Sequence, residues 1–188
     1  MIILHGSHPI QSAAENRYDL GFSYLVDQLA DAGYLALSMN VGMNYSFENG
    51  EPNGCQRTVQ IVEQQSVLLK QAMKGKEGIF PCDLKNKGNL SQVILVGHSR
   101  ADYDIFEVAD QTEILGIQGL ISTAPSLVSP LSGTPANVPA GIIIPQYDGD
   151  VTSLDGGTLF DQLENTPQRT SGTDIIYLEN GNHGEIST

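Results

Sequence analysis

The segment Gly97-His98-Ser99-Arg100-Ala101 places a serine between small residues at the point where a strand is expected to end. Residues 93–96 form a short apolar run, and the residues after the segment are typical of a helix. A sharp strand-to-helix turn exposes a serine hydroxyl and directs the first amides of the helix toward developing negative charge. The pattern therefore predicts Ser99 as a nucleophile. An ordinary Gly-Ser loop is the alternative interpretation.

A serine hydroxyl is a poor nucleophile near neutral pH, so it needs a base, and the base needs an acid that orients it. His183, in a Gly-rich segment after the last expected strand, is the candidate general base. We expect the side chain of His98 to point away from the position that a base must occupy. His5 and His8 have a spacing that suits metal ligands, but no third ligand accompanies them, so we expect no metal site.

Two carboxylates follow the expected strand at residues 141–145, and either could orient the base. Asp148 lies three residues before Val151, the usual placement for this role, and is our candidate for the acid. Asp150 is the alternative, and Asp155 is a weaker one. The resulting order of serine, aspartate and histidine along the chain is one of the known orders for a catalytic triad.

An oxyanion formed during acyl transfer needs two amide donors. One is expected from the N–H of Arg100, directly after the nucleophile, and the other from Ser7, in the loop after the first expected strand. Gly6 would allow the backbone of that loop to approach the site closely, although a simple turn glycine is the alternative. With a serine and a base, these donors would support acyl transfer to water.

Composition limits the remaining classes of function. With 188 residues, 40% of them hydrophobic, the chain suits one globular domain over residues 1–188. Its net charge of −13 and its lack of a Lys/Arg cluster argue against nucleic-acid binding, and its apolar runs are too short to span a membrane. Cys55 and Cys82 form either one disulfide or two ordinary thiols, and they are too few for a zinc site.

Strand and helix patterns alternate along the chain. Strands are expected at residues 2–4, 34–38, 93–96, 117–122, 141–145 and 174–178, and helices at 19–32, 59–73, from the elbow to about 110, and at 159–164. This alternation predicts an α/β fold in which a mainly parallel sheet of about six strands lies between helices as a three-layer α/β/α sandwich. The chemistry is expected beyond the carboxyl ends of the strands. Loops are expected at 40–53, 127–139 and 179–184; the loop at 127–139 is too short for a large lid.

With these residues in place, the chain resembles the α/β-hydrolase family. The resemblance rests on four segments: residues 4–6 for the oxyanion loop, 97–101 for the elbow, 147–150 for the acid turn and 181–183 for the base. Within that family, the sequence of these segments is similar to that of secreted bacterial esterases of the chlorophyllase, cutinase and polyester-hydrolase kind. The resemblance implies a serine hydrolase without a cofactor that cleaves small or polymeric carboxylic esters through an acyl-enzyme. It also suggests secretion, although the chain has no signal peptide.

The chain departs from the family pattern in three places. Ala101 replaces a glycine, a small change that the turn should tolerate. The family has further strands before the His5-Gly6 segment and a helix after the base, and the chain lacks both, so we expect a truncated or excised core. An exposed sheet edge and homo-oligomerisation would follow.

The rival hypothesis is an inactive binding domain of the same fold, or a fragment of a larger protein. Tyr45, Phe47, Tyr103 and Tyr147 could line an open cleft, although aromatic residues more often pack in the core.

Overall fold

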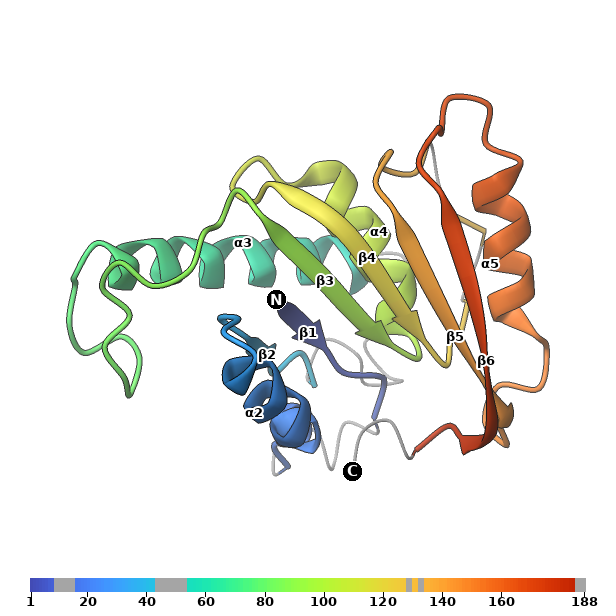
Figure 1. Ribbon diagram of the computed structural model, residues 1–188, viewed down its shortest axis with the longest axis horizontal. Helices are drawn as coiled ribbons and strands as arrows, with labels where there is room; N and C mark the ends of the chain where they lie inside the picture. The colour runs from blue at the N-terminus through green and yellow to red at the C-terminus, as the bar shows by residue number, and fades with distance from the viewer. Residues whose placement is uncertain (9–15, 43–53, 128–129, 132–133, 185–188) are drawn as a thin grey trace.

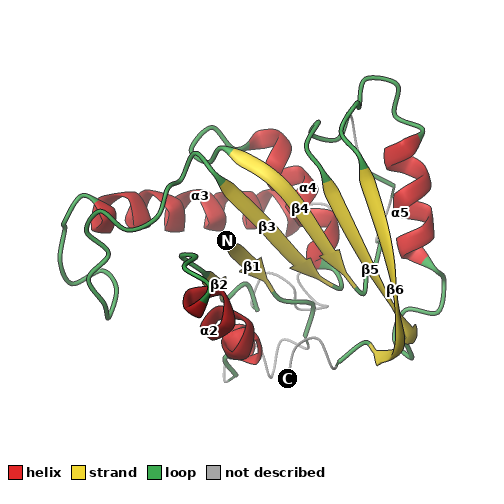
Figure 2. Ribbon diagram, in the orientation of Figure 1, coloured by secondary structure: helices red, strands yellow, loops and turns green. Residues whose placement is uncertain are grey.

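A computed structural model describes residues 1–8, 16–42, 54–127, 130–131 and 134–184 and contains a six-stranded sheet (Figures 1 and 2). Every strand pair in it is parallel, and the order is β2-β1-β3-β4-β5-β6. The strands are β1 (Ile2–Leu4), β2 (Leu37–Met39), β3 (Val93–His98), β4 (Ile117–Thr123), β5 (Ala140–Tyr147) and β6 (Thr173–Asn182). The predicted mainly parallel sheet of about six strands is confirmed.

Helices cover both faces of the sheet (Figure 1). One face packs against α3 (Gly54–Met73), α4 (Ala101–Gln111) and α5 (Asp155–Glu164), and the other packs against η1 (Tyr18–Phe22) and α2 (Ser23–Asp31). Successive strand residues point to opposite faces, so Leu95 joins the larger apolar cluster and Val96 the smaller one. The predicted three-layer arrangement is thus confirmed.

The helices bury residues at helical spacing. In α5, Leu159 and Leu163 lie four residues apart and are both buried against the sheet. In α4, Ile105 and Val108 are fully buried, so this helix is held close behind β3. This packing fixes the first turn of α4 relative to the end of β3, where Ser99 lies.

Several expected boundaries were wrong. The second strand was expected to start at residue 34, but the chain still forms a turn there. Gly33 has a left-handed φ of 88°, and the N–H of Tyr34 donates to the carbonyl of Leu29. As a result, β2 begins only at residue 37. The expected loop at 179–184 is also wrong, since β6 continues to residue 182. The helix expected at 19–32 begins with the 3₁₀ turn η1, and the helix expected at 59–73 begins at residue 54.

The disulfide interpretation of the two cysteines was wrong as well. No bond joins them, because Cys55 is buried on α3 whereas Cys82 lies exposed in the loop after that helix. Most of the loop expected at 40–53 lies outside the described residues. Within the described part of the 127–139 connection there is no helix or strand.

Strand β6 forms one edge of the described sheet, and its apolar side chains Ile175, Ile176, Tyr177 and Leu178 are all exposed by more than two fifths. A parallel strand at an edge leaves backbone groups without a ladder partner on its outer side. Homo-oligomerisation through such an edge stays a prediction.

None of the described helices combines the length and the apolar character that a membrane-spanning segment needs.

Candidate active site

Ser99 occupies a sharp turn between β3 and α4. Its φ of 57° lies in the left-handed region, which is strained for a residue with a side chain and is seen where the surrounding structure imposes it. Its N–H donates to the carbonyl of Thr123 at 3.0 Å, which ties the turn to the end of β4. A Cβ at Gly97 would lie only 2.7 Å from the carbonyl oxygen of Ala101, so the strand and helix meet at backbone contact. The turn has the geometry that the five-residue segment predicted.

Asp148 and His183 form a hydrogen-bonded pair. The imidazole Nδ1 of His183 donates to Oδ2 of Asp148 at 2.9 Å, and the two side chains are only 14% and 9% exposed. The other carboxylate oxygen, Oδ1, accepts the N–H groups of Asp150 and Val151, so it closes the turn after β5. These bonds fix the carboxylate, and the carboxylate fixes the ring of His183 with its Nε2 facing away from Asp148.

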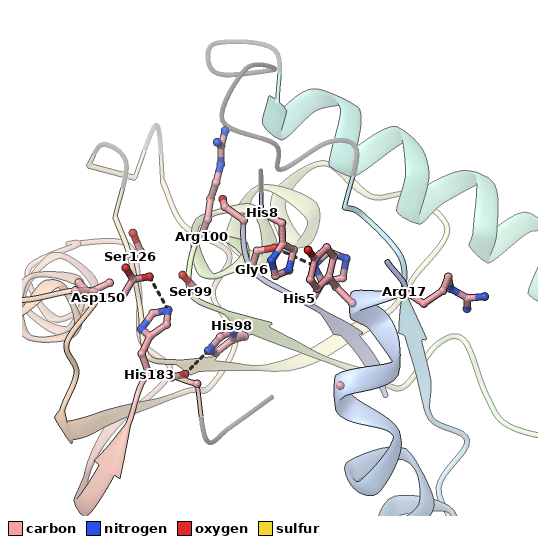
Figure 3. Close-up of a pocket in the computed structure, with 15 residues that line it drawn as sticks. His5, Gly6, His8, Arg17, His98, Ser99, Arg100, Ser126, Asp150 and His183 are labelled. Carbon is pink, nitrogen blue, oxygen red and sulfur yellow. Dashed lines mark hydrogen bonds and ion pairs between the residues drawn. The ribbon is translucent and has the colours of Figure 1, made fainter. Parts of the chain in front are cut away.

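Asp150, the alternative acid, lies on the opposite side of the same ring. Its Oδ2 is 3.4 Å from Nε2 of His183, and its side chain is 75% exposed. The two carboxylates therefore contact different nitrogens of one imidazole. In the described contacts Nε2 faces Asp150, and it is not hydrogen-bonded to the hydroxyl of Ser99. Figure 3 shows His183 and Ser99 along the same side of the cleft.

His98 holds the backbone at His183. Its Nε2–H donates to the carbonyl oxygen of His183 at 2.9 Å, and the two rings lie 4.9 Å apart (Figure 3). Burial lowers the pKa of His98 to about 4, although the hydrogen bond to the carbonyl of His183 opposes this shift, so His98 is neutral near pH 7. Its side chain does not point into solvent but under the cleft, against Phe22. The expectation that it cannot act as the base agrees with this placement.

The loop after β1 lies directly against the turn that contains Ser99. A Cβ at Gly6 would lie 2.8 Å from Cβ of Ser99, so only glycine permits this approach. His5 supports the loop: its Nδ1 donates to the carbonyl of Gly6, and its Nε2 accepts the N–H of Val41. Both nitrogens are thus used by backbone groups, and burial lowers the pKa of His5. Ser7 and Arg100 both line the cleft beside this contact.

The cleft above these residues has a volume of about 660 Å³. Its far wall contains a stack that the sequence did not predict: the rings of His8 and Tyr18 are 3.2 Å apart and nearly parallel, at 9°. Burial lowers the pKa of His8 to about 4. Arg17 also lines this wall and pairs with Asp19 at 2.6 Å.

Of the four aromatic residues that could line the cleft, the two that the structure describes do not line it. Tyr103 is buried on α4 among the core residues, and Tyr147 is 61% exposed at the end of β5. Neither side chain lines the cleft. Tyr45 and Phe47 lie outside the described residues. Spacing along the chain does not show which face an aromatic side chain takes, and that choice decided these two positions.

One buried carboxylate lies behind the elbow and faces no solvent. Asp102, in the first turn of α4, is fully buried, and its Oδ1 accepts the N–H of Thr123 at 3.0 Å. Burial raises the pKa of Asp102 well above its ordinary value, although Ser122 and the Thr123 N–H oppose the rise. The side chain of Asp102 therefore joins α4 to the end of β4 beneath Ser99. Its raised pKa favours the protonated form of the carboxyl group.

Solved structures resemble this arrangement over nearly the whole chain. A protein named as a hydrolase of the alpha/beta superfamily from Xanthomonas campestris pv. campestris matches with a TM-score of 0.57 and 16% identity, covering 97% of this chain and 86% of the other. An alpha-beta serine hydrolase homologue from Coxiella burnetii matches with a TM-score of 0.58 and 20% identity, covering 97% and 76%. The protein has the α/β-hydrolase fold.

A further structure with this fold, a dienelactone hydrolase-like promiscuous phosphotriesterase from metagenomic libraries, matches with a TM-score of 0.57 and 13% identity, covering 97% of this chain and 70% of the other. No family model and no curated protein matches the sequence. At these identities the likeness establishes the α/β-hydrolase fold, and the chemistry must be argued from the site itself.

Proposed function

We propose that the protein is a serine hydrolase that cleaves carboxylic esters through an acyl-enzyme intermediate. The observation that carries the proposal is that one cleft joins Ser99, on a strained turn, to His183, whose Nδ1 is held by Asp148 at 2.9 Å. A binding module has no need for a serine at a strained φ opposite an oriented imidazole. The α/β-hydrolase fold, shared with proteins named as hydrolases, supports the same class of reaction.

In the first half of the reaction, Nε2 of His183 takes the hydroxyl proton of Ser99 as the serine oxygen bonds to the ester carbonyl carbon. For this step the ring must turn its Nε2 from Asp150 toward the serine, and hydrogen bonds of this kind often tighten only when substrate is bound. Asp148 keeps its bond to Nδ1 and stabilises the imidazolium. The tetrahedral oxyanion would accept the N–H groups of Ser7 and Arg100.

The intermediate then collapses. The bond between the carbonyl carbon and the alkoxy oxygen breaks, and Nε2–H of His183 gives its proton to that oxygen, so an alcohol leaves and the acyl group stays on Ser99. In the second half, water takes the place of the alcohol: His183 removes its proton, hydroxide oxygen bonds to the acyl carbon, and the serine oxygen leaves with the proton. The products are a carboxylic acid, an alcohol and the original enzyme.

The experiment that tests this function compares the wild type with Ser99→Ala on p-nitrophenyl acetate and p-nitrophenyl butyrate. Hydrolysis by the wild type and a loss of about a thousandfold or more in Ser99→Ala are expected, because the variant has no oxygen to acylate. Circular dichroism checks that both proteins are folded. Activity that survives in Ser99→Ala contradicts the proposal, and a folded but inert wild type favours the rival hypothesis of an inactive binding domain.

A further inference from the structure

Asp150 is a carboxylate that the proposed reaction does not use. Asp148 already holds Nδ1 of His183, whereas Asp150 lies 3.4 Å from Nε2, the nitrogen that exchanges protons. The two acids also differ in exposure, since 9% of the Asp148 side chain and 75% of the Asp150 side chain are accessible. Asp150 therefore stands at the mouth of the cleft, next to the reacting nitrogen (Figure 3).

The leaving group of an ester would lie at this end of the cleft, beside Nε2 of His183 and Asp150. Nε2 of His183 must come within hydrogen-bond distance of the alkoxy oxygen in order to protonate it. The alcohol portion of the substrate consequently lies next to Nε2 and within a few ångströms of the Asp150 carboxylate. At such a distance a charge on the alcohol portion interacts with Asp150 directly, and solvent at the mouth of the cleft weakens this interaction without removing it.

The arginines that line the cleft do not offset this carboxylate. Arg17 is already paired with Asp19 through two hydrogen bonds, at 2.6 and 2.8 Å. The side chain of Arg100 points away from both His183 and Asp150, as Figure 3 shows. All nine lysines and arginines of the chain fall within the described residues, and the undescribed segments contain glutamates but no lysine or arginine.

The imidazoles around the cleft add no positive charge either. Burial lowers the pKa of His5, and it lowers those of His8 and His98 to about 4, so all three are neutral near pH 7. The net charge of −13 acts in the same direction as Asp150 and attracts cations from solution. The end of the cleft that would receive the leaving group is thus negative.

We propose that Asp150 is a specificity-determining residue and that the cleft prefers esters whose alcohol portion carries a positive charge. The proposal rests on the proposed ester hydrolysis and names its substrate class. A cationic alcohol portion is attracted by Asp150 at the stage where the C–O bond breaks, and an anionic one is repelled there. The acyl portion, which remains on Ser99, lies on the other side of the carbonyl carbon and is not subject to this selection.

A pair of esters of the same shape tests the charge alone. Butyrylcholine carries a quaternary ammonium group, and 3,3-dimethylbutyl butyrate is its neutral counterpart with carbon in place of nitrogen. The measured quantity is the ratio of kcat/KM for the cationic ester to that for the neutral ester. We expect this ratio to fall by about two- to fivefold in Asp150→Asn, which keeps the shape of the side chain, and to fall with added salt in the wild type.

Asp174→Asn is the matched control, because it removes one negative charge from an exposed residue at the start of β6, at the opposite end of the sheet. Its ratio should stay at the wild-type value. If both esters bind without turnover, their inhibition constants against p-nitrophenyl butyrate supply the same ratio.

The outcomes separate the two proposals. An unchanged ratio in Asp150→Asn, with the neutral ester still hydrolysed, overturns the role of Asp150 and leaves ester hydrolysis standing. An equal fall in Asp174→Asn assigns the preference to overall charge and also overturns it. A folded wild type that hydrolyses no ester, p-nitrophenyl butyrate included, overturns the proposed function and this inference with it.

Discussion

The imidazole of His98 donates a hydrogen bond to the backbone carbonyl of His183 across 2.9 Å, although 85 residues separate the two along the chain. The residue before the candidate nucleophile thus holds the loop that carries the candidate base. Because His98 is largely buried and its pKa is lowered to about 4, the ring stays neutral near pH 7 and this bond persists there. The elbow therefore positions two members of the site, one through its turn and one through its neighbouring side chain.

This contact predicts a loss of rate when the donor is removed. In His98→Leu the carbonyl of His183 loses its partner and the loop shifts, and a displacement of about 1 Å at a reacting group costs up to about a hundredfold in rate. We expect kcat for p-nitrophenyl butyrate to fall by about ten- to a hundredfold with little change in KM. His98→Gln, whose amide can still donate, should recover part of the loss. Equal kcat values in the two variants would contradict the positioning role.

The two carboxylates around His183 should differ sharply when each is replaced by its amide. In Asp148→Asn, the Nδ1 contact no longer stabilises an imidazolium, and the wrong tautomer of the ring is favoured, so we expect kcat to fall by about a thousandfold or more. Oδ1 of the amide can still close the turn, so folding should survive. In Asp150→Asn, we expect less than a tenfold change on the uncharged p-nitrophenyl butyrate, because this side chain is mostly exposed. Steady-state kinetics of both variants would check this, and the reverse order of effects would assign the acid role to Asp150.

The sequence predicted the parts of this arrangement that depend on short patterns. The alternation of apolar strands and amphipathic helices was enough for the layers of the fold, and the 97–101 segment was enough for the turn at Ser99, because both are local. The choice between Asp148 and Asp150 was not local: both follow β5, and only the path of β6 decides which nitrogen of His183 each one faces.

Features made by distant segments could not be predicted in this way. The stack of His8 on Tyr18 depends on how η1 returns over the loop after β1. The start of β2 was misplaced because a left-handed turn at Gly33 follows the end of α2 at Asp31, and β2 begins only at residue 37. The stack of His8 on Tyr18 is a tertiary contact that the pattern of residue types does not show, whereas the turn at Gly33 is local and shifted only the start of β2.

The buried carboxylate of Asp102 predicts a dependence of stability on pH. Its pKa is raised in the folded state, so as pH increases above about 4 the unfolded chain releases this proton while the folded protein retains it, and the wild type loses stability. The loss continues until the pH passes the folded-state pKa. Asp102→Asn cannot ionise and keeps an oxygen for the Thr123 N–H. We expect it to be more stable than the wild type by about 1–3 kcal/mol at pH 8.

Urea unfolding of both proteins at pH 4 and pH 8 would measure this difference in the free energy of unfolding. The advantage of Asp102→Asn should be larger at pH 8, because below about pH 4 the wild-type side chain is protonated in both states. An advantage of the same size at both values would show that Asp102 ionises normally in the folded protein.

The approach of Gly6 to Ser99 predicts a loss of activity together with a loss of stability when Gly6 gains a side chain. A methyl group in Gly6→Ala would come within 2.8 Å of Cβ of Ser99, so the loop after β1 must retreat or the turn must shift, and the expected amide of Ser7 would move from the oxyanion with it. We expect kcat/KM for p-nitrophenyl butyrate to fall by about a hundredfold, together with a loss of about 1–3 kcal/mol in the free energy of unfolding.

Gly157→Ala is the matched control. Gly157 lies on α5, and a Cβ added there would have no neighbouring atom within 4 Å. This variant should keep full activity and gain slightly in stability. If Gly6→Ala retains wild-type kcat/KM, the loop after β1 does not supply an oxyanion donor.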